Sequence, residues 1–92
     1  MSAKIYWTID LLEEFGPQLR SPYSKPLGDG IFELRSEIGS DITRVLYFFV
    51  LDKKAILTHG FTKKTPKTPR SEISRAKKYR AEYMSRNIKK EG

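Results

Sequence analysis

The most apolar part of the chain is TRVLYFFVL at residues 43–51, which is rich in β-branched and aromatic residues. Such residues favour extended strands. Alternation puts Tyr47 and Phe49 on one side of the strand and Leu46 and Phe48 on the other. A strand that is apolar on both sides is typical of a sheet covered on both faces. We therefore expect residues 43–51 to form the central strand, with Phe48 and Phe49 largely buried on opposite faces.

Two further extended runs flank this strand, at about residues 31–36 and 54–61. Turn-forming residues separate the runs, with Gly39 before the central strand and Asp52-Lys53 after it. Runs joined by such short turns pair as neighbouring antiparallel strands. We therefore expect a small, twisted antiparallel sheet of at least three strands. In the last run, strict alternation would place four residues on one face: Ala55, Leu57, His59 and Phe61.

The region before the sheet has helical spacing. A helix of about residues 3–15 carries its main apolar positions on one side: Ile5, Ile9 and Leu12. Gly16-Pro17 ends this helix. The broad apolar stripe predicts that the helix covers one face of the sheet, with Trp7 as a packing residue. Residues 16–30 are rich in proline and glycine and are predicted to form a connecting loop.

A second helix is predicted after the sheet, over about residues 69–88. Thr68 is its expected cap, and Pro69 fits its first turn, where a missing N–H is tolerated. The apolar stripe of this helix is narrow, so the helix should pack along one edge and expose basic faces. Residues 62–68 form a basic loop before it. We expect one α+β domain, residues 1–92, with the first helix packed on the sheet and a basic C-terminal helix.

The composition removes several kinds of site. The chain has 92 residues, no cysteine and one histidine. Disulfides, thiolate metal sites and cysteine nucleophiles are therefore excluded, and a structural zinc site is disfavoured. We expect neither a metal nor a cofactor. No apolar run reaches the roughly 18 residues of a membrane span, and the N-terminus lacks the apolar core of a signal peptide. We expect a cytoplasmic protein without membrane contact.

The positive charge is concentrated in the last third of the chain. Residues 63–92 hold eleven Lys or Arg and three Asp or Glu, a charge of +8, whereas residues 1–62 hold seven and eight, a charge of −1. This asymmetry indicates a polyanionic partner, either nucleic acid or an acidic protein surface. The alternative is a solvated basic helix that only keeps the protein soluble. If the partner is RNA, four basic residues are expected to bind it: Arg35, Lys67, Arg70 and Lys77.

The single histidine lies beside this basic segment, because Lys63 and Lys64 follow His59 closely. Cleavage of RNA needs a group that moves a proton and fixed positive charge that stabilises the phosphorane. Imidazole titrates near neutral pH, and Lys or Arg supplies the charge. We therefore assign four candidate catalytic residues: Arg44, His59, Lys63 and Lys64. In the alternative, His59 is a packed, hydrogen-bonded residue, and Arg35 and Arg44 pair with nearby carboxylates: Glu33, Glu37 or Asp41.

Several short motifs follow one another along the chain: IDLLEEFG at 9–16, FELR at 32–35, RVLYF at 44–48, HGFTKK at 59–64 and KTP at 67–69. Their order and spacing resemble the phage-derived Gp49-like family, which belongs to the HigB branch of the RelE/ParE toxin superfamily. The resemblance covers about residues 5–83. Each motif alone carries little information, whereas the set in this order is specific.

The resemblance implies the toxin component of a type II toxin–antitoxin system. Toxins of this superfamily typically cleave mRNA on the translating ribosome and are neutralised by a HigA-like helix-turn-helix antitoxin. An Arg near the start of the central strand commonly contacts the phosphate in them, and Arg44 occupies that position here. Lys63 and Lys64 stand where the superfamily commonly has basic residues. The expected activity is therefore that of a ribosome-dependent mRNA endoribonuclease.

One departure from the family pattern leaves an alternative open. Members usually begin with an additional strand before the first helix, whereas this chain starts inside that helix. Without that strand a sheet edge would be unpaired, which favours pairing with another chain, as in a homodimer. The alternative function is a non-catalytic member of the same fold that binds nucleic acid or a protein partner. A ParE-like topoisomerase inhibitor and an inactive phage remnant are both of this kind.

Overall fold

The computed structural model describes residues 3–51, 54–63 and 67–91, without the side chains of Lys63 and residues 87–91. The strands of the described chain form one antiparallel sheet in the order β1-β2-β3-β4. The fold is therefore α+β, as predicted. The elements follow in this order: α1 (Ala3–Phe15), the 3-10 helix η1 (Gly16–Gln18), β1 (Ser24–Gly28), β2 (Ile31–Ile38), β3 (Asp41–Val50), β4 (Lys54–Lys63) and α2 (Arg70–Glu91).

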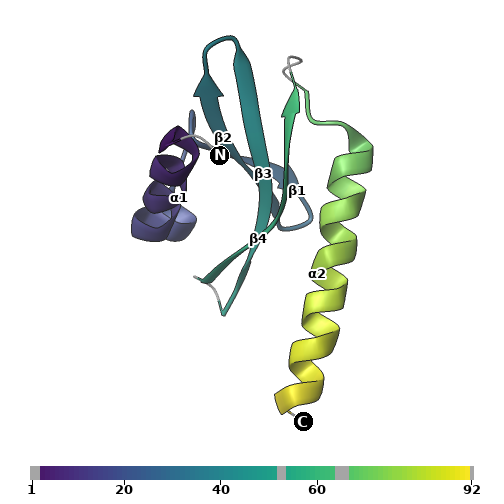
Figure 1. The fold of residues 1–92 in the computed structure, drawn as a ribbon. Coiled ribbons are helices and arrows are strands. Elements are labelled where there is room, and N and C mark those ends of the chain that lie inside the picture. The colour runs from purple at the N-terminus through teal and green to yellow at the C-terminus, as the bar shows by residue number, and fades with distance from the viewer. Residues whose placement is uncertain (1–2, 52–53, 64–66, 92) are drawn as a thin grey trace.

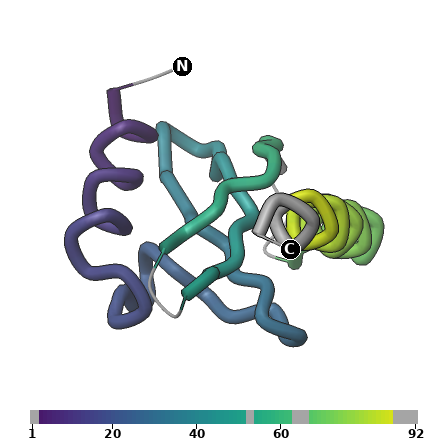
Figure 2. Tube along the Cα trace, turned by 90° about the horizontal axis from the view of Figure 1, so that it is seen from below, coloured from purple at the N-terminus to yellow at the C-terminus, as the bar shows by residue number. Residues whose placement is uncertain are grey.

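The two α-helices lie on opposite sides of the sheet. Figure 1 shows α1 on the left, the sheet in the middle and α2 on the right, and the view from below in Figure 2 gives the same order. β3 is an inner strand, paired with β2 on one side and β4 on the other. Its two apolar faces are therefore covered by different helices, which is what its sequence predicts. No helix in the described ranges is long and apolar enough to cross a membrane.

The predicted loop over residues 16–30 is wrong in two places. Gly16–Gln18 is a short 3-10 helix, and Ser24–Gly28 is the strand β1. β1 is an edge strand. Pro26 has no N–H to donate to a neighbouring strand, but an edge strand tolerates this loss, so Pro26 still pairs with Phe32. A register shift between Pro26 and Gly28 ends the strand. Prolines and glycines thus mark an edge here rather than a loop.

α1 has its predicted bounds, whereas β2, β3, β4 and α2 lie close to their predicted positions but are longer. β2 extends to Ile38 and β3 begins at Asp41, because the turn between them is tight and Gly39 takes a positive φ of 63° there. β4 continues to Lys63, so the first residues of the predicted basic loop belong to the sheet. α2 begins at Arg70 and continues to Glu91.

On the face under α1, the core is apolar. Leu12 and Leu19 pack against Leu34 and Tyr47, and all of them are at most 8% exposed. The Tyr47 hydroxyl shares a hydrogen bond with Ser24 Oγ, which satisfies the one polar group of the ring. Burial raises the pKa of Tyr47. This side of the sheet therefore has the usual properties of a hydrophobic core.

Two aromatic residues on this side are less buried than predicted. Phe49 packs against the cluster but is only partly buried. Its β4 partner, Ala55, lines an open cavity of about 330 Å³ between α1 and β4, so the helix does not cover this end of the sheet. Trp7, predicted as a packing residue, is 47% exposed.

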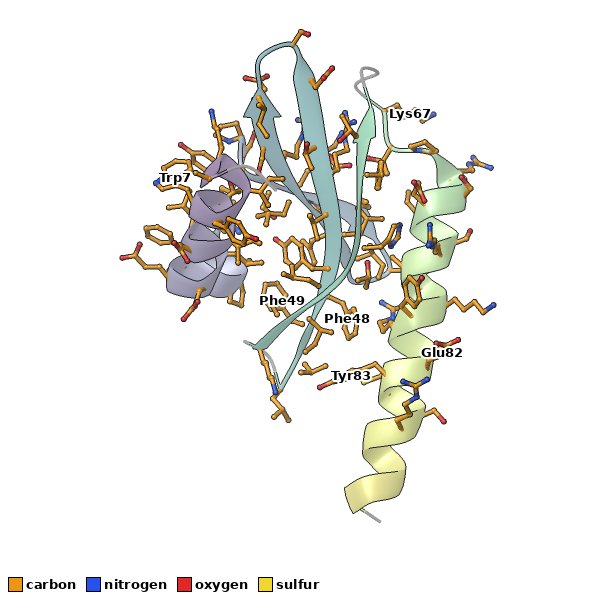
Figure 3. The ribbon with its side chains drawn as sticks, in the orientation of Figure 1. Trp7, Phe48, Phe49, Lys67, Glu82 and Tyr83 are labelled. Atoms are coloured by element: carbon orange, nitrogen blue, oxygen red, sulfur yellow. The ribbon has the colours of Figure 1, made fainter. Side chains whose placement is uncertain are left out.

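On the face under α2, the apolar cluster is built from Ile31, Leu46, Phe48 and Ala76. Phe48 is 1% exposed, as predicted, and meets the Tyr83 ring edge to face with centroids 5.7 Å apart (Figure 3). Ala76 is the fully buried residue of the described part of α2. α2 therefore docks through a narrow apolar stripe, and the rest of this face holds polar groups.

Candidate functional site

A bulge in β4 decides where His59 points. Val45 pairs with Gly60 and Tyr47 pairs with Leu57, so Thr58 and His59 together oppose Leu46. Two residues opposite one is the arrangement of a β-bulge, which re-aims side chains and is common next to functional sites. The predicted face of Ala55, Leu57, His59 and Phe61 is consequently wrong. Ala55 packs on the α1 side, whereas Phe61 packs on the α2 side and His59 stacks on it.

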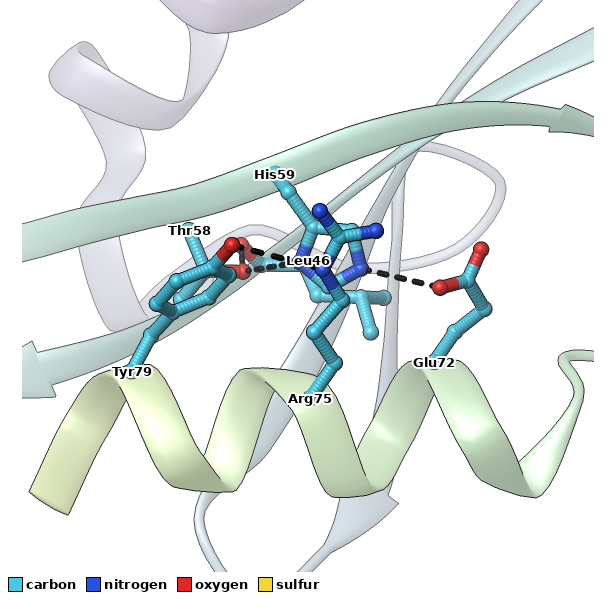
Figure 4. Close-up of polar contacts among 6 residues, drawn as sticks. All are labelled: Leu46, Thr58, His59, Glu72, Arg75 and Tyr79. Carbon is cyan, nitrogen blue, oxygen red and sulfur yellow. Dashed lines mark hydrogen bonds and ion pairs between the residues drawn. The ribbon is translucent and has the colours of Figure 1, made fainter.

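Both ring nitrogens of His59 are hydrogen-bonded. Nδ1 lies 3.1 Å from Thr58 Oγ1, and Nε2 lies 3.3 Å from Glu72 Oε1 (Figure 4). The Thr58 hydroxyl donates its single hydrogen to the Leu46 carbonyl at 2.8 Å, so it can only accept from Nδ1. An ionised Glu72 can likewise only accept from Nε2. The two contacts are satisfied together when His59 is an imidazolium that donates from both nitrogens.

An aromatic wall surrounds the imidazole. The His59 side chain is 10% exposed and stacks on Phe61, with centroids 5.9 Å apart and an interplanar angle of 28°. The Tyr79 ring lies 5.7 Å away on the α2 side, and Arg75 Nε donates to its hydroxyl at 3.3 Å. Tyr79 is 37% exposed, so this side of the site borders solvent. The site is a seam between β4 and the first turns of α2.

Next to this seam lies a buried ionic cluster centred on Glu33. Arg35 and Arg44 are cross-strand partners, and Glu33 stands between their side chains. Arg44 Nε is 3.4 Å from Glu33 Oε2, and Arg35 Nε is 3.3 Å from Glu33 Oε1. Both Glu33 and Arg44 are at most 1% exposed. Burial raises the pKa of Glu33, although the two guanidinium groups oppose the shift.

Two expectations about Arg44 have different outcomes. Arg35 and Arg44 do come together near one end of the sheet. Arg44, however, is not on the surface where an RNA phosphate would lie, since its side chain is 0% exposed. Its side chain follows the alternative arrangement, a pair with Glu33. Arg44 also shares its sheet face with His59, because its β4 partner Phe61 is the residue on which His59 stacks.

The expected cap of α2 has another role. The first backbone hydrogen bonds of the helix run from Glu72 and Ile73 to the carbonyl of Pro69, so Pro69 is the capping position. The Thr68 hydroxyl instead donates to Glu33 Oε2. Thr68 is 7% exposed, which places it inside the ionic cluster. The start of α2 is thereby tied to the sheet.

The remaining predicted residues are spread over three places. Lys67 (Figure 3) and Arg70 are exposed at the start of α2, close in sequence to Thr68 and Glu72. Lys77 instead binds Asp29 in the β1–β2 turn at 2.7 Å, and this contact lowers the pKa of Asp29. Lys63 lies in β4 opposite Ile42. Its side chain, and Lys64 as a whole, lie outside the described residues.

Sequence reasoning named Glu33 only as one of three possible partners of Arg35 and Arg44, and it missed the other polar partners in this site. The carboxylates of Glu33 and Glu72 and the hydroxyls of Thr58 and Thr68 hold the candidate residues in place. An acidic residue in the first turn of a helix is a recognisable signal, because it favours the helix dipole. It does not say which histidine the carboxylate will meet. Within the described ranges, no group of three His, Cys, Asp or Glu side chains is placed to hold a metal ion.

Comparison with known proteins gives one family. Residues 1–81 match the family model described as Phage derived protein Gp49-like (DUF891), and this span runs from α1 well into α2. Neither a curated protein nor a solved structure matches the chain.

Proposed function

The chain belongs to the phage-derived Gp49-like family, and from this premise we propose that it is the toxin component of a type II toxin–antitoxin system. Its activity is the cleavage of mRNA on the ribosome, as in HigB- and RelE-type toxins. The observation that carries this proposal is the His59–Glu72 contact of 3.3 Å at the base of the basic helix α2. It joins a proton donor to a carboxylate beside exposed cations.

The proposed reaction uses these groups in order. The exposed Lys67 and Arg70 hold the RNA backbone at the start of α2. The substrate replaces Glu72 as the partner of His59 Nε2. The 2′-oxygen then attacks phosphorus, its proton passes to Glu72, and His59 donates a proton to the departing 5′-oxygen. The products are a 2′,3′-cyclic phosphate and a 5′-hydroxyl.

In this proposal Arg44 acts on the phosphorane from its buried position. A fixed buried charge stabilises the phosphorane through a medium of low polarity, where electrostatic interactions are stronger than in water. Glu33 neutralises part of that charge, so a change at Glu33 alters cleavage through Arg44.

Induced expression followed by mapping of mRNA 5′ ends tests the proposal. The wild-type chain should create new 5′ ends inside translated codons. His59→Gln keeps polarity and approximate size, and it should lower the cleavage rate about a hundred- to ten-thousandfold. Glu72→Gln should lower it as well, whereas Glu82→Gln, an exposed position further along α2 (Figure 3), should not. A folded His59→Gln chain that cleaves at the wild-type rate rules out the proposed chemistry.

The proposed partner is a helix-turn-helix antitoxin encoded beside this chain. Coexpression with such a neighbour should restore growth and give a complex that copurifies. The basic α2, in a segment of charge +8, suits an acidic antitoxin surface.

A second candidate function is favoured by one observation. Arg44 is buried against Glu33, and both nitrogens of His59 already have partners, so the site as it stands binds no phosphate through them. A non-catalytic member of the family would have such a closed site. In that case RNA or partner binding would persist with no new 5′ ends in any condition.

A further inference from the structure

A groove at the β1 edge of the sheet gathers positive charge and an exposed indole. Two adjoining cavities, of about 280 and 500 Å³, share Arg35 and Pro22 in their walls, and the larger one is also lined by residues of β1. The first lies against Trp7 and Tyr23. We call the two together the α1–β1 groove. Their sizes are close to those of ordinary ligand pockets, about 300–1,000 Å³.

The charge of the groove differs from that of the surrounding sequence. Residues 1–62 carry a net charge of −1, yet the groove walls hold four cations, Lys4, Arg20, Lys25 and Arg35, and one carboxylate, Glu37. Lys4, Arg20 and Lys25 are exposed. Arg35 keeps 27% of its side chain accessible while its Nε faces Glu33. The fold therefore concentrates positive charge at a place where the sequence shows none.

Trp7 adds a stacking surface to this charge. Its ring meets Tyr23 nearly at right angles, at 76° and 5.7 Å between centroids. An edge-to-face contact uses at most one face of the indole, and Trp7 is 47% exposed. Trp7 is thus not needed as a core residue, and a planar ligand can stack on it. Aromatic rings beside cationic grooves are how proteins hold single-stranded nucleic acid without reading its sequence.

We propose that the α1–β1 groove binds a nucleotide of single-stranded RNA, with a base stacked on Trp7 and phosphates held by Arg35, Arg20 and Lys25. The groove shares Arg35 with the Glu33 cluster, but its walls contain no residue of the His59 seam. It lies beside β1, at the opposite edge of the sheet from β4, which carries His59. The proposal rests on the proposed function only in choosing RNA among polyanions, since charge and stacking fit the nucleotide itself.

The only tryptophan of the chain provides a direct test. The full-length protein is titrated with a short single-stranded 2′-O-methyl RNA, which cannot be cleaved through its 2′-oxygen, while Trp7 fluorescence is followed. Saturable quenching is expected. Binding of the same RNA carrying a fluorescent label is measured by anisotropy, and Trp7→Ala should weaken it roughly 5- to 150-fold, the effect of losing one stacked base. Trp7→Phe should retain most of the affinity.

A matched pair of charge variants separates local contact from net charge. Lys25→Gln in β1 and Lys54→Gln in β4 remove the same charge from exposed strand positions. Lys25→Gln should reduce the slope of log K against log salt by about 0.7, the value for one phosphate contact on a single strand. Lys54→Gln should leave the slope and the quenching unchanged.

Several results would overturn the assignment. RNA binding without quenching of Trp7 places the RNA elsewhere. A free mononucleotide that quenches as tightly as the RNA assigns the groove to a small ligand, and poly-glutamate that does so assigns it to an acidic protein segment. None of these results concerns cleavage, which depends on His59. The groove and the proposed nuclease activity can therefore fail independently.

Discussion

Beneath α1 the sheet presents Leu34 and Tyr47 to an apolar helix face. The buried hydroxyl pairs on this side, Thr8 with Ser36 and Ser24 with Tyr47, are uncharged. Beneath α2 the same strands bury a carboxylate and a guanidinium, Glu33 and Arg44. Both faces belong to one sheet, so the difference arises because successive side chains along β2 and β3 point to opposite faces. Odd positions of β2 and even positions of β3 point at α2.

The comparison separates stability from chemistry. Burial of apolar side chains is favourable in proportion to area, whereas a buried ion pair often does no better than an apolar replacement of the same volume. The apolar clusters of both faces therefore stabilise the fold, and the ionic end of the α2 face contributes little net stability. That end also lies beside the His59 seam and holds the start of α2 through Thr68. The variants below test this division.

The largest effect is expected for Phe48→Ala. Phe48 is 1% exposed, so the change should lower the free energy of unfolding by about 3–5 kcal/mol. Small domains have about 5–15 kcal/mol in total, so the variant should be close to unfolding. Phe49→Ala, at a partly buried position on the other face, should have a clearly smaller effect. Urea titrations of both variants measure the difference, and equal midpoints would contradict the assigned burial.

The ionic cluster should respond differently to single and double changes. Arg44→Met leaves Glu33 without its fully buried cation, which typically lowers stability by about 3–5 kcal/mol. Glu33→Gln together with Arg44→Met removes both charges and should recover most of that loss. The double-mutant cycle is measured by denaturant unfolding. Additive losses would show that the two side chains do not interact, against the observed 3.4 Å contact.

The sequence predicts those features of the structure that local contacts determine, and it fails for those that distant contacts determine. The helix over 3–15 and the buried Phe48 follow from periodicity, which any solvent-shielded element must obey. β1 was missed because Pro26 and Gly28 are typical of loops, and only pairing with β2 makes the segment a strand. The placement of His59 depends on the bulge, and the burial of Arg44 depends on α2. Neither has a local sequence signal.

Hydrogen bonds on the two faces should differ in strength because their acceptors differ in charge. Thr68 donates to the Glu33 carboxylate, so Thr68→Val should cost about 1.5–3 kcal/mol. Ser36 donates to the neutral Thr8 hydroxyl at 2.9 Å, so Ser36→Ala should cost about 0.5–1.5 kcal/mol. Thermal melts of both variants at one pH check the order. A larger loss at Ser36 would mean that Thr68 does not hold the start of α2.

The smallest expected effect is a pH dependence that belongs to Glu33. Its folded-state pKa is raised above the ordinary value of 4.5 because the carboxyl is buried. Between 4.5 and the raised folded value, the unfolded chain has released the proton that the folded chain still holds. Stability contributed by this group therefore falls as pH rises through that window and is constant above it. The free energy of unfolding of the wild type minus that of Glu33→Gln should increase as the pH falls from 7 to about 4.5. If this difference decreases instead, Arg44 and Arg35 outweigh the burial, and the cluster then stabilises the folded state at neutral pH much as the apolar core under α1 does.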